Sequence, residues 1–76
     1  MKRAEYFVLE NLPRGASRVQ KEKLISNVVD DMSLFDASTT RGDVMIALDS
    51  LNEQQFIVLF RDGTVAMTAH GESMTT

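Results

Sequence analysis

The chain has 76 residues, of which 43% are hydrophobic and 25% charged, with no cysteine and a formal net charge of −3. This length predicts one domain over residues 1–76, and the apolar share excludes a disordered protein. The absence of cysteine excludes disulfides and thiolate metal sites, and no stretch approaches the roughly eighteen apolar residues of a membrane span. Glu5 and Glu10 interrupt the first apolar run, so we expect a cytoplasmic protein without a secretory signal.

Residues 4–10 favour a β-strand, because they are rich in aromatic and β-branched types. Apolar side chains fall on both faces of this strand, which indicates that it is covered on both sides. Pro13, Arg14 and Gly15 then break the chain.

Residues 17–33 predict a helix. Ser17 is a suitable N-cap, and Gln20 three residues later completes a capping box. We expect Leu34 and Phe35 to follow the helix and to fold back onto the core. The inward stripe has helical spacing and consists of Leu24, Ile25, Val28, Val29 and Met32.

The charges along the chain are arranged against the dipole of that helix. The first 23 residues carry six bases and three acids, whereas the rest carry two bases and eight acids. Arg18 and Lys21 therefore lie near the start of the helix, and Asp30 and Asp31 lie near its end. A helix prefers the opposite arrangement, because its N-terminus is partly positive and its C-terminus partly negative. We expect a partner molecule to compensate these charges.

Residues 36–42 are small and polar and predict a loop. Thr40 then caps a second helix at 43–51, with Asp43 as its partner at the third helical position. A strand over 43–48 is the alternative, because apolar residues there also alternate. The cap and the leucine, alanine and methionine content favour the helix.

Two apolar runs at 56–61 and 64–69 flank an Asp-Gly dipeptide at 62–63, which indicates a β-hairpin with a two-residue turn. This turn places Ile57 and Leu59 on the outer face, where they are either exposed for a partner or covered by another element. The predicted core face consists of three cross-strand pairs, Phe60–Val65, Val58–Met67 and Phe56–Ala69.

The predicted fold class is α+β, a small single domain of order β-α-α-β-β. It forms a three-stranded sheet with two helices packed on one face. An alternative replaces the first hairpin strand by a helix from Ser50 to Arg61 that ends at Gly63. Residues 71–76 are polar and are predicted as a frayed tail.

The composition offers little for catalysis. His70 is the single histidine and no cysteine is present, so neither a nucleophile–base pair nor a His/Cys metal site has support. Asp30, Asp31 and Asp36 lack the regular spacing of a calcium loop. We expect neither an enzyme nor a bound cofactor or metal.

Three basic residues, Arg14, Arg18 and Lys21, surround the start of the first predicted helix. Backbone N–H groups at a helix start bind anions, and arginine pairs well with carboxylate or phosphate. These residues are therefore candidates for binding a phosphate, a carboxylate or an acidic partner.

We expect a non-catalytic protein-binding or regulatory module that binds itself or a host protein, and neither nucleic acid nor a membrane. Small acidic single-domain chains are a common format for phage or mobile-element proteins that inhibit or redirect a host protein. In a homodimer, two copies of the 17–33 helix would pack antiparallel, with the bases of one opposite the acids of the other. The predicted partner-binding residues are Arg14, Arg18, Lys21, Asp30, Asp31, Ile57 and Leu59.

An alternative class is nucleic-acid or phospholigand binding through the basic N-terminal third, with Tyr6 or Phe7 available for stacking. The negative net charge and the lack of a recognised motif argue against it. A small enzyme is the third class, and a chain of this size leaves little room for a substrate pocket.

Overall fold

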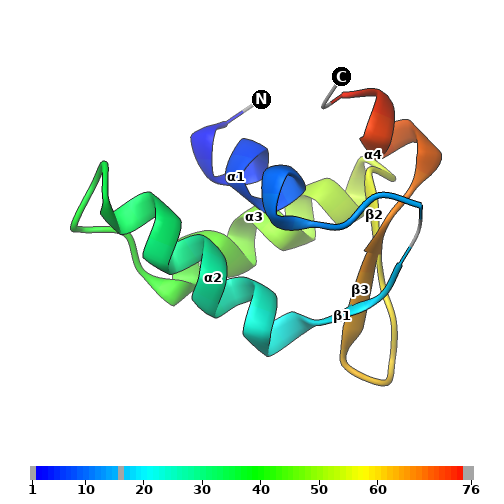
Figure 1. Cartoon of the computed structure of the whole chain (residues 1–76), viewed down its shortest axis with the longest axis horizontal. Coiled ribbons are helices and arrows are strands. Elements are labelled where there is room, and N and C mark those ends of the chain that lie inside the picture. Colours follow the sequence, from blue (N-terminus) through cyan, green and yellow to red (C-terminus); the bar gives the residue numbers. More distant parts are fainter. Residues whose placement is uncertain (1, 16, 75–76) are drawn as a thin grey trace.

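Four helices and one three-stranded antiparallel sheet make up the described part of the computed structural model, residues 2–15 and 17–74. The α+β class and the three-stranded sheet expected from the sequence are confirmed. The elements follow one another as α1 (Arg3–Asn11), β1 (Val19–Gln20), α2 (Lys21–Ser33), α3 (Arg41–Glu53), β2 (Ile57–Leu59), β3 (Thr64–Met67) and α4 (Ala69–Ser73) (Figure 1).

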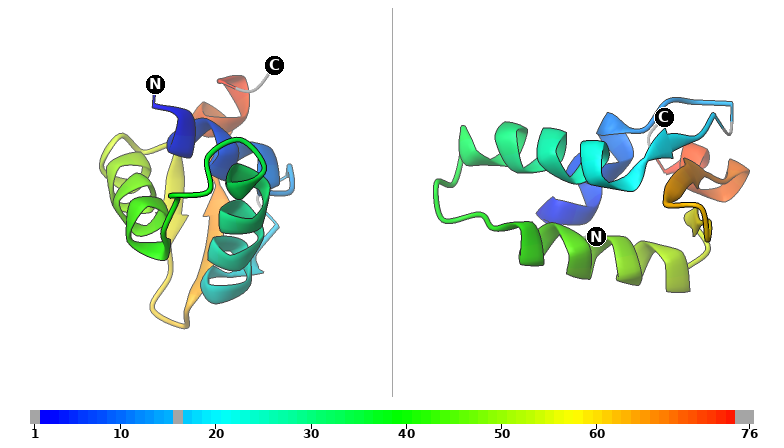
Figure 2. Two further views of the ribbon diagram at one scale, coloured as in Figure 1. Left: turned by 90° about the vertical axis from the view of Figure 1, so that its left-hand side faces the viewer. Right: turned by 90° about the horizontal axis from the view of Figure 1, so that it is seen from below.

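The sheet lies at one end of the molecule, and helices α2 and α3 extend from it to the opposite end, where a loop joins them (Figure 1). Its strand order is β1-β3-β2, so β3 is central and pairs antiparallel with both neighbours. Helix α1 lies between α2 and α3 and packs against both (Figure 2). The core therefore forms where these three helices meet one another and the inner face of the sheet.

Helices α1, α2 and α3 and the hairpin together supply the core. Full burial of one such side chain stabilises the fold by about 1.5–3 kcal/mol, so the helices and the hairpin depend on each other. The largest fully buried side chains are Val8, Leu9, Leu24, Ile25, Val28, Val44, Leu48, Leu51, Ile57, Val65 and Met67.

The first element is the helix α1, and the prediction of a strand at 4–10 is wrong. Glu5, Val8, Leu9 and Leu12 are all buried, and their spacing of three and four residues is that of one helix face. The strand prediction followed the aromatic and β-branched composition of the segment. The helical period of the buried positions is hard to see in the sequence, because one of them is the acidic residue Glu5. Packing against α2 and α3 thus overrides β propensity.

Helix α2 begins at Lys21, and its predicted start with a cap at Ser17 is wrong. Gln20 is the N-cap, and its side chain makes no capping hydrogen bond. Val19 and Gln20 form β1 and pair with β3, so β1 takes the place of the predicted first strand. The Lys21 N–H donates to the Gly63 carbonyl at 2.8 Å, which ties the start of the helix to the hairpin turn.

Helix α3 confirms the second predicted helix over its strand alternative. The Asp43 N–H donates to Thr40 Oγ1 at 3.3 Å, and the Thr40 N–H donates to Asp43 Oδ2 at 3.0 Å. This reciprocal capping box is the one the sequence predicted. Gln54 is the C-cap and Gln55 takes a positive φ of 65°, so the alternative of a helix continuing to Arg61 is wrong.

The β-hairpin around residues 62–63 is confirmed, but its register is one residue away from the prediction. The Phe60 N–H donates to the Thr64 carbonyl at 2.9 Å, which leaves a three-residue loop closed by Gly63 at φ 85°. A slip of one residue exchanges the two faces of a strand. The observed pairs are Ile57–Met67, Val58–Ala66 and Leu59–Val65.

The slip reverses the predicted roles of several hairpin side chains. Ile57 is 1% exposed and belongs to the core, and Leu59 is half-buried against it. The prediction that these two side chains project from an outer face toward a partner is therefore wrong. Val58, predicted as core, is 40% exposed.

The chain after β3 forms the short helix α4, so the prediction of a frayed tail over 71–76 is wrong as far as Ser73. The Gly71 N–H donates to Thr68 Oγ1 at 3.0 Å, which caps the helix. The helix contacts β3 and buries Gly71. Residues 75–76 of the predicted tail lie outside the described part of the chain.

A methyl group at Gly71 has no room. A Cβ there would meet the Phe56 carbonyl oxygen and lie 2.9 Å from Met67 Cγ. We therefore expect Gly71→Ala to lower the free energy of unfolding by about 2 kcal/mol, because α4 must shift away from the start of β2. Urea unfolding followed by circular dichroism measures this change.

Gly42 on α3 provides the matched control. A Cβ at this position meets only Thr40 Oγ1 at 3.6 Å. Gly42→Ala should raise the free energy of unfolding by about 0.5–1 kcal/mol, since alanine loses less chain entropy in a helix. Equal effects of the two substitutions would contradict the close packing of α4.

Candidate functional site

Two of the three basic residues predicted to surround the start of the helix make contacts within the chain. Arg18 precedes β1 and lies outside α2; its guanidinium lies 3.7 Å from the centroid of the Phe60 ring and 3.5 Å from Asp62 Oδ2. Arg14 also has an interaction of its own within the chain. Lys21 is half-buried in the first turn of α2. The structure therefore does not gather these three residues into one free cationic site.

Asp62 is the anchor of the hairpin turn. It accepts hydrogen bonds from the Thr64 hydroxyl at 2.5 Å and from the Thr64 N–H at 3.0 Å. These bonds, with a smaller contribution from the charge of Arg18, hold the pKa of the Asp62 carboxyl below its usual range. The turn, the cation and the ring of Phe60 form one connected surface cluster.

The acids at the end of α2 lie where the sequence predicted them, unlike the bases predicted at its start. Asp30 and Asp31 are exposed in its last turns, and no basic residue is present in the last turn to compensate the helix dipole. At the start of the helix the predicted clash with the dipole is weaker, because Arg18 lies outside α2 and Glu22 accompanies Lys21 in the first turn.

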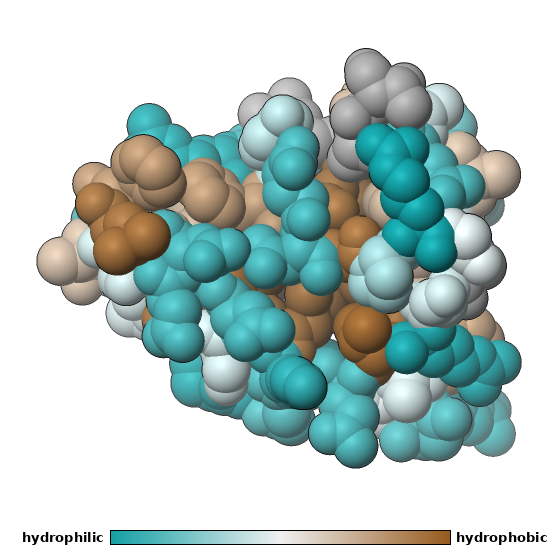
Figure 3. Space-filling view, in the orientation of Figure 1, coloured by the Kyte–Doolittle hydropathy of each residue, from teal (hydrophilic) through white to brown (hydrophobic). Residues whose placement is uncertain are grey.

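An exposed apolar patch lies directly after α2. Leu34 is 81% exposed and Phe35 is 72% exposed, so the expectation that they fold back onto the core is wrong. The ring of Phe35 contacts that of Phe7 on α1, with centroids 5.7 Å apart. Figure 3 shows apolar surface at this end of the molecule, where α2 passes into the loop before α3. We call Phe7, Leu34 and Phe35 the end patch.

A second exposed surface, of apolar and acidic side chains, lies along α3. Met45 is 44% exposed and Ile46 is 65% exposed, and Asp49 and Glu53 are exposed one and two turns further along the helix. These residues lie on one side of the helix, because their spacings are three, four, seven and eight. We call Met45, Ile46, Asp49 and Glu53 the α3 outer face.

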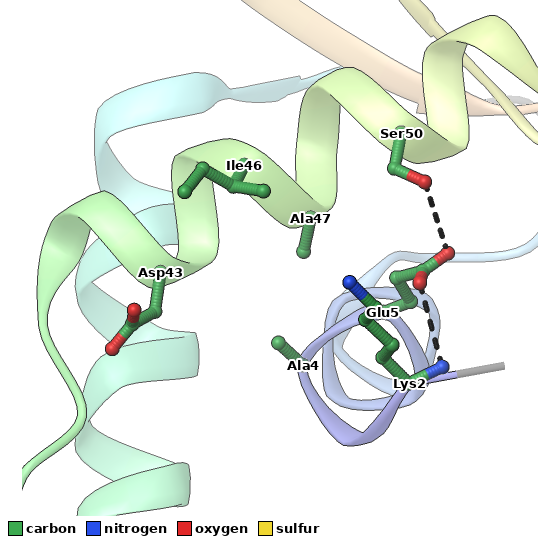
Figure 4. Close-up of a pocket in the computed structure, with 7 residues that line it drawn as sticks. All are labelled: Lys2, Ala4, Glu5, Asp43, Ile46, Ala47 and Ser50. Atoms are coloured by element: carbon green, nitrogen blue, oxygen red, sulfur yellow. Dashed lines mark hydrogen bonds between the residues drawn. The ribbon is translucent and has the colours of Figure 1, made fainter.

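A small cavity of about 60 Å³ opens between α1 and α3 beside this face. Figure 4 shows Ala4 of α1 and Ala47 of α3 pointing toward each other across it, with Ile46 on the same stretch of α3. Glu5 lines the cavity and is only 5% exposed. Lys2 and Asp43 also line the cavity, so it combines apolar walls with the buried carboxyl of Glu5 and two further charged side chains.

Neutral groups satisfy the oxygens of Glu5. Gln54 Nε2 donates at 3.1 Å, Ser50 Oγ at 3.4 Å and the Lys2 N–H at 3.4 Å. Within the ranges 2–15 and 17–74, no cation forms an ion pair with this carboxylate. Glu5 was not among the predicted site residues, although its place in the buried stripe of α1 could have drawn attention to it once that segment was assigned to a helix.

A broad, shallow hollow of about 540 Å³ lies at the other end of α3. Val58, Thr68 and His70 line part of it, and the imidazole of His70 stacks on the Phe56 ring with centroids 4.7 Å apart. In the described part of the chain, no three His, Cys, Asp or Glu side chains converge as metal ligands. None of the helices described has the length and hydropathy to span a membrane.

Comparison with models of protein families, with curated proteins and with solved structures found no match to this chain.

Replacing Asp62 tests the hairpin cluster through its pH dependence. A carboxyl whose pKa is lowered by folding stabilises the folded state above its ordinary pKa, and this contribution is lost as the pH falls through about 4 and below. We expect Asp62→Asn to be less stable than the unmodified protein at neutral pH, and the difference to shrink at about pH 3. Thermal unfolding at the two pH values measures it.

The control for this substitution is Asp49→Asn, which removes one exposed carboxylate outside the hairpin. If the two variants lose the same stability at neutral pH, the hydrogen bonds to Asp62 do not stabilise the turn.

Proposed function

We propose that this chain is a non-catalytic protein-binding module that regulates another protein by occupying its surface, with the cytoplasm as its place of action. The observation that carries the proposal is the end patch, where Leu34 and Phe35 are 81% and 72% exposed side by side. Adjacent large apolar side chains exposed to this extent mark contact surfaces in folded proteins.

The end patch has the anatomy of a contact surface. Phe35 rests on the ring of Phe7, so the apolar centre is held in place before a partner arrives. Asp30, Asp31 and Asp36 are exposed residues that precede and follow the two apolar side chains in the chain. An apolar centre with a charged rim is typical of protein interfaces.

The partner is a different protein in this proposal. The antiparallel pairing of two 17–33 helices relied on Arg18, which is paired with Asp62 in the same chain. An inhibitor or modulator of a host protein, of the kind that phages and mobile elements encode, is the form of this function that size and acidity favour.

Substitution of the end patch tests the proposal. We expect Leu34→Ser/Phe35→Ser to reduce capture of the partner from cells that produce the chain at least about tenfold, because burial of these side chains supplies a few kcal/mol of binding energy. Cross-linking followed by quantitative mass spectrometry measures the capture.

Val58→Thr, at an exposed apolar position of β2, is the matched control and should leave capture unchanged. Equal capture by the double variant and the unmodified chain would contradict the proposal. Sedimentation at high micromolar concentration separates the two kinds of partner: a two-chain mass that is lost in the double variant identifies the partner as a second copy.

Topology favours a second candidate function, nucleic-acid binding. Helices α2 and α3 follow one another ahead of the β2–β3 hairpin, and two successive helices joined by a turn are the arrangement of a helix-turn-helix motif. In helix-turn-helix proteins the second helix of the motif enters the major groove. The corresponding helix here is α3, and the seven residues between α2 and α3 exceed the turn of about three or four residues typical of the motif.

The charges of α3 oppose this candidate. Asp43, Asp49 and Glu53 are exposed on it, and its single base, Arg41, forms an ion pair with Glu22 of α2. A surface of this sign repels phosphate. The likeness to a helix-turn-helix motif is therefore one of element order, and one fold carries many functions.

Fluorescence anisotropy with a labelled duplex of about 20 base pairs tests the second candidate. At low salt we expect no saturable binding below about 10 µM, because carboxylates cover α3. Binding with a steep salt dependence that disappears in Arg14→Ala/Lys21→Ala would instead establish the basic N-terminal third as a phosphate-binding surface.

A further inference from the structure

We propose that the α3 outer face and the adjoining cavity rim form a docking site for a basic amphipathic helix of a partner protein. This inference rests on the proposed function in taking the chain to bind a protein, and it assigns a second surface and the chemistry of its occupant. Two observations carry it: exposed apolar side chains on α3 and unpaired carboxylates beside them.

The apolar part of the site consists of Met45 and Ile46. They are 44% and 65% exposed although the neighbouring positions Val44 and Ala47 are buried. Ile46 also lines the cavity, together with Ala4 and Ala47 (Figure 4). Apolar anchors of a partner therefore have a continuous contact from the helix surface into the hollow.

The charged part of the site is acidic. Asp49 and Glu53 are exposed on the same side of α3, and neither forms an ion pair with a base in the segments that the structure describes. Arg41, the one base on α3, is held by Glu22 of α2. The complementary occupant is thus a segment that carries lysine or arginine beside its apolar residues.

The cavity is already lined by charged side chains of this chain. Lys2 and Asp43 line it together with the buried carboxyl of Glu5 (Figure 4), and neutral donors satisfy the Glu5 oxygens. The contact with a partner is therefore assigned to Ile46 at the cavity rim and to the carboxylates of the α3 outer face.

The length and shape of α3 indicate a helical occupant. Its 13 residues span about 20 Å, which matches three to four turns of a helix lying along it. A helix that docks in this way places apolar anchors at spacings of three, four and seven residues and leaves its flanks for charged contacts.

A synthetic helical peptide of about 18 residues tests the site. It carries leucines along one face and lysines on the flanks, with a fluorescein label for anisotropy. We expect a dissociation constant of about 10 µM, a loss of at least about tenfold with Asp49→Lys/Glu53→Lys, and a loss of about fivefold with Ile46→Ser. Thermal unfolding of each variant confirms that the fold is retained.

Asp30→Lys/Asp31→Lys is the matched control, because it makes the same charge change on α2. We expect it to change affinity less than about twofold at physiological salt. Equal losses from the two charge reversals would overturn the proposal, since they would show attraction to net charge alone. Absence of binding by the unmodified chain would overturn it as well.

The NMR spectrum tests where the peptide binds. Amide shift changes in the NMR spectrum at Ala4, Ile46 and Asp49 upon peptide addition are expected, and changes confined to α2 would overturn the placement.

The peptide-binding test of the α3 site and the partner-capture test of the end patch can fail independently. Leu34→Ser/Phe35→Ser lies outside the docking site and should leave peptide affinity unchanged. If the peptide does not bind but the double variant still loses its captured partner, the α3 site is overturned and the proposed function stands. If the peptide binds as expected and no partner depends on the end patch, the site stands and the proposed use of the end patch is wrong.

Discussion

The insertion of α1 between α2 and α3 is the constraint on which the rest of the structure depends. Val8 and Leu9 are 0% and 1% exposed, and their burial closes the core that α2 and α3 leave open between them. Because these side chains must face inward, Glu5 on the same stripe is carried inside with them. Neutral donors from Ser50 and Gln54 then satisfy its oxygens, and the small cavity beside it is the space that remains between α1 and α3.

A core of this size does not accommodate every large apolar side chain of the chain. Small domains bury a smaller fraction of their surface than large ones, and here one stripe of each helix faces the core. Leu34 and Phe35 follow the end of α2, and Met45 and Ile46 lie off the inward stripe of α3, so all four remain exposed. Both surfaces combine apolar side chains with exposed carboxylates, which is why both suit a partner that carries bases.

The hairpin shows that the number of basic residues in a segment does not decide whether they are available to a partner. The N-terminal third of the chain is basic, yet Arg18 is used inside the molecule, over Phe60 and beside Asp62. Arg41 is used in the same way to join α3 to α2 through Glu22. These pairs are exposed and contribute little stability each. Their consequence is that the free surface of α3 is acidic.

Helix α3 and the hairpin turn were determined by the sequence itself, because Thr40 with its capping partner and the Asp-Gly dipeptide each act within a few consecutive residues. The helical state of α1 and the register of the hairpin were decided only in the tertiary structure. A segment rich in β-forming residues becomes a helix when Val8 and Leu9 gain burial against α2 and α3, and an Asp-Gly turn fits loops of two or three residues until packing selects one. The candidate surfaces divide in the same way. Ile46 lies off the buried stripe of α3, which has helical spacing and consists of Val44, Ala47, Leu48 and Leu51. The exposure of Phe35 and the burial of Glu5 depend instead on contacts between segments far apart in the chain, which local sequence does not specify.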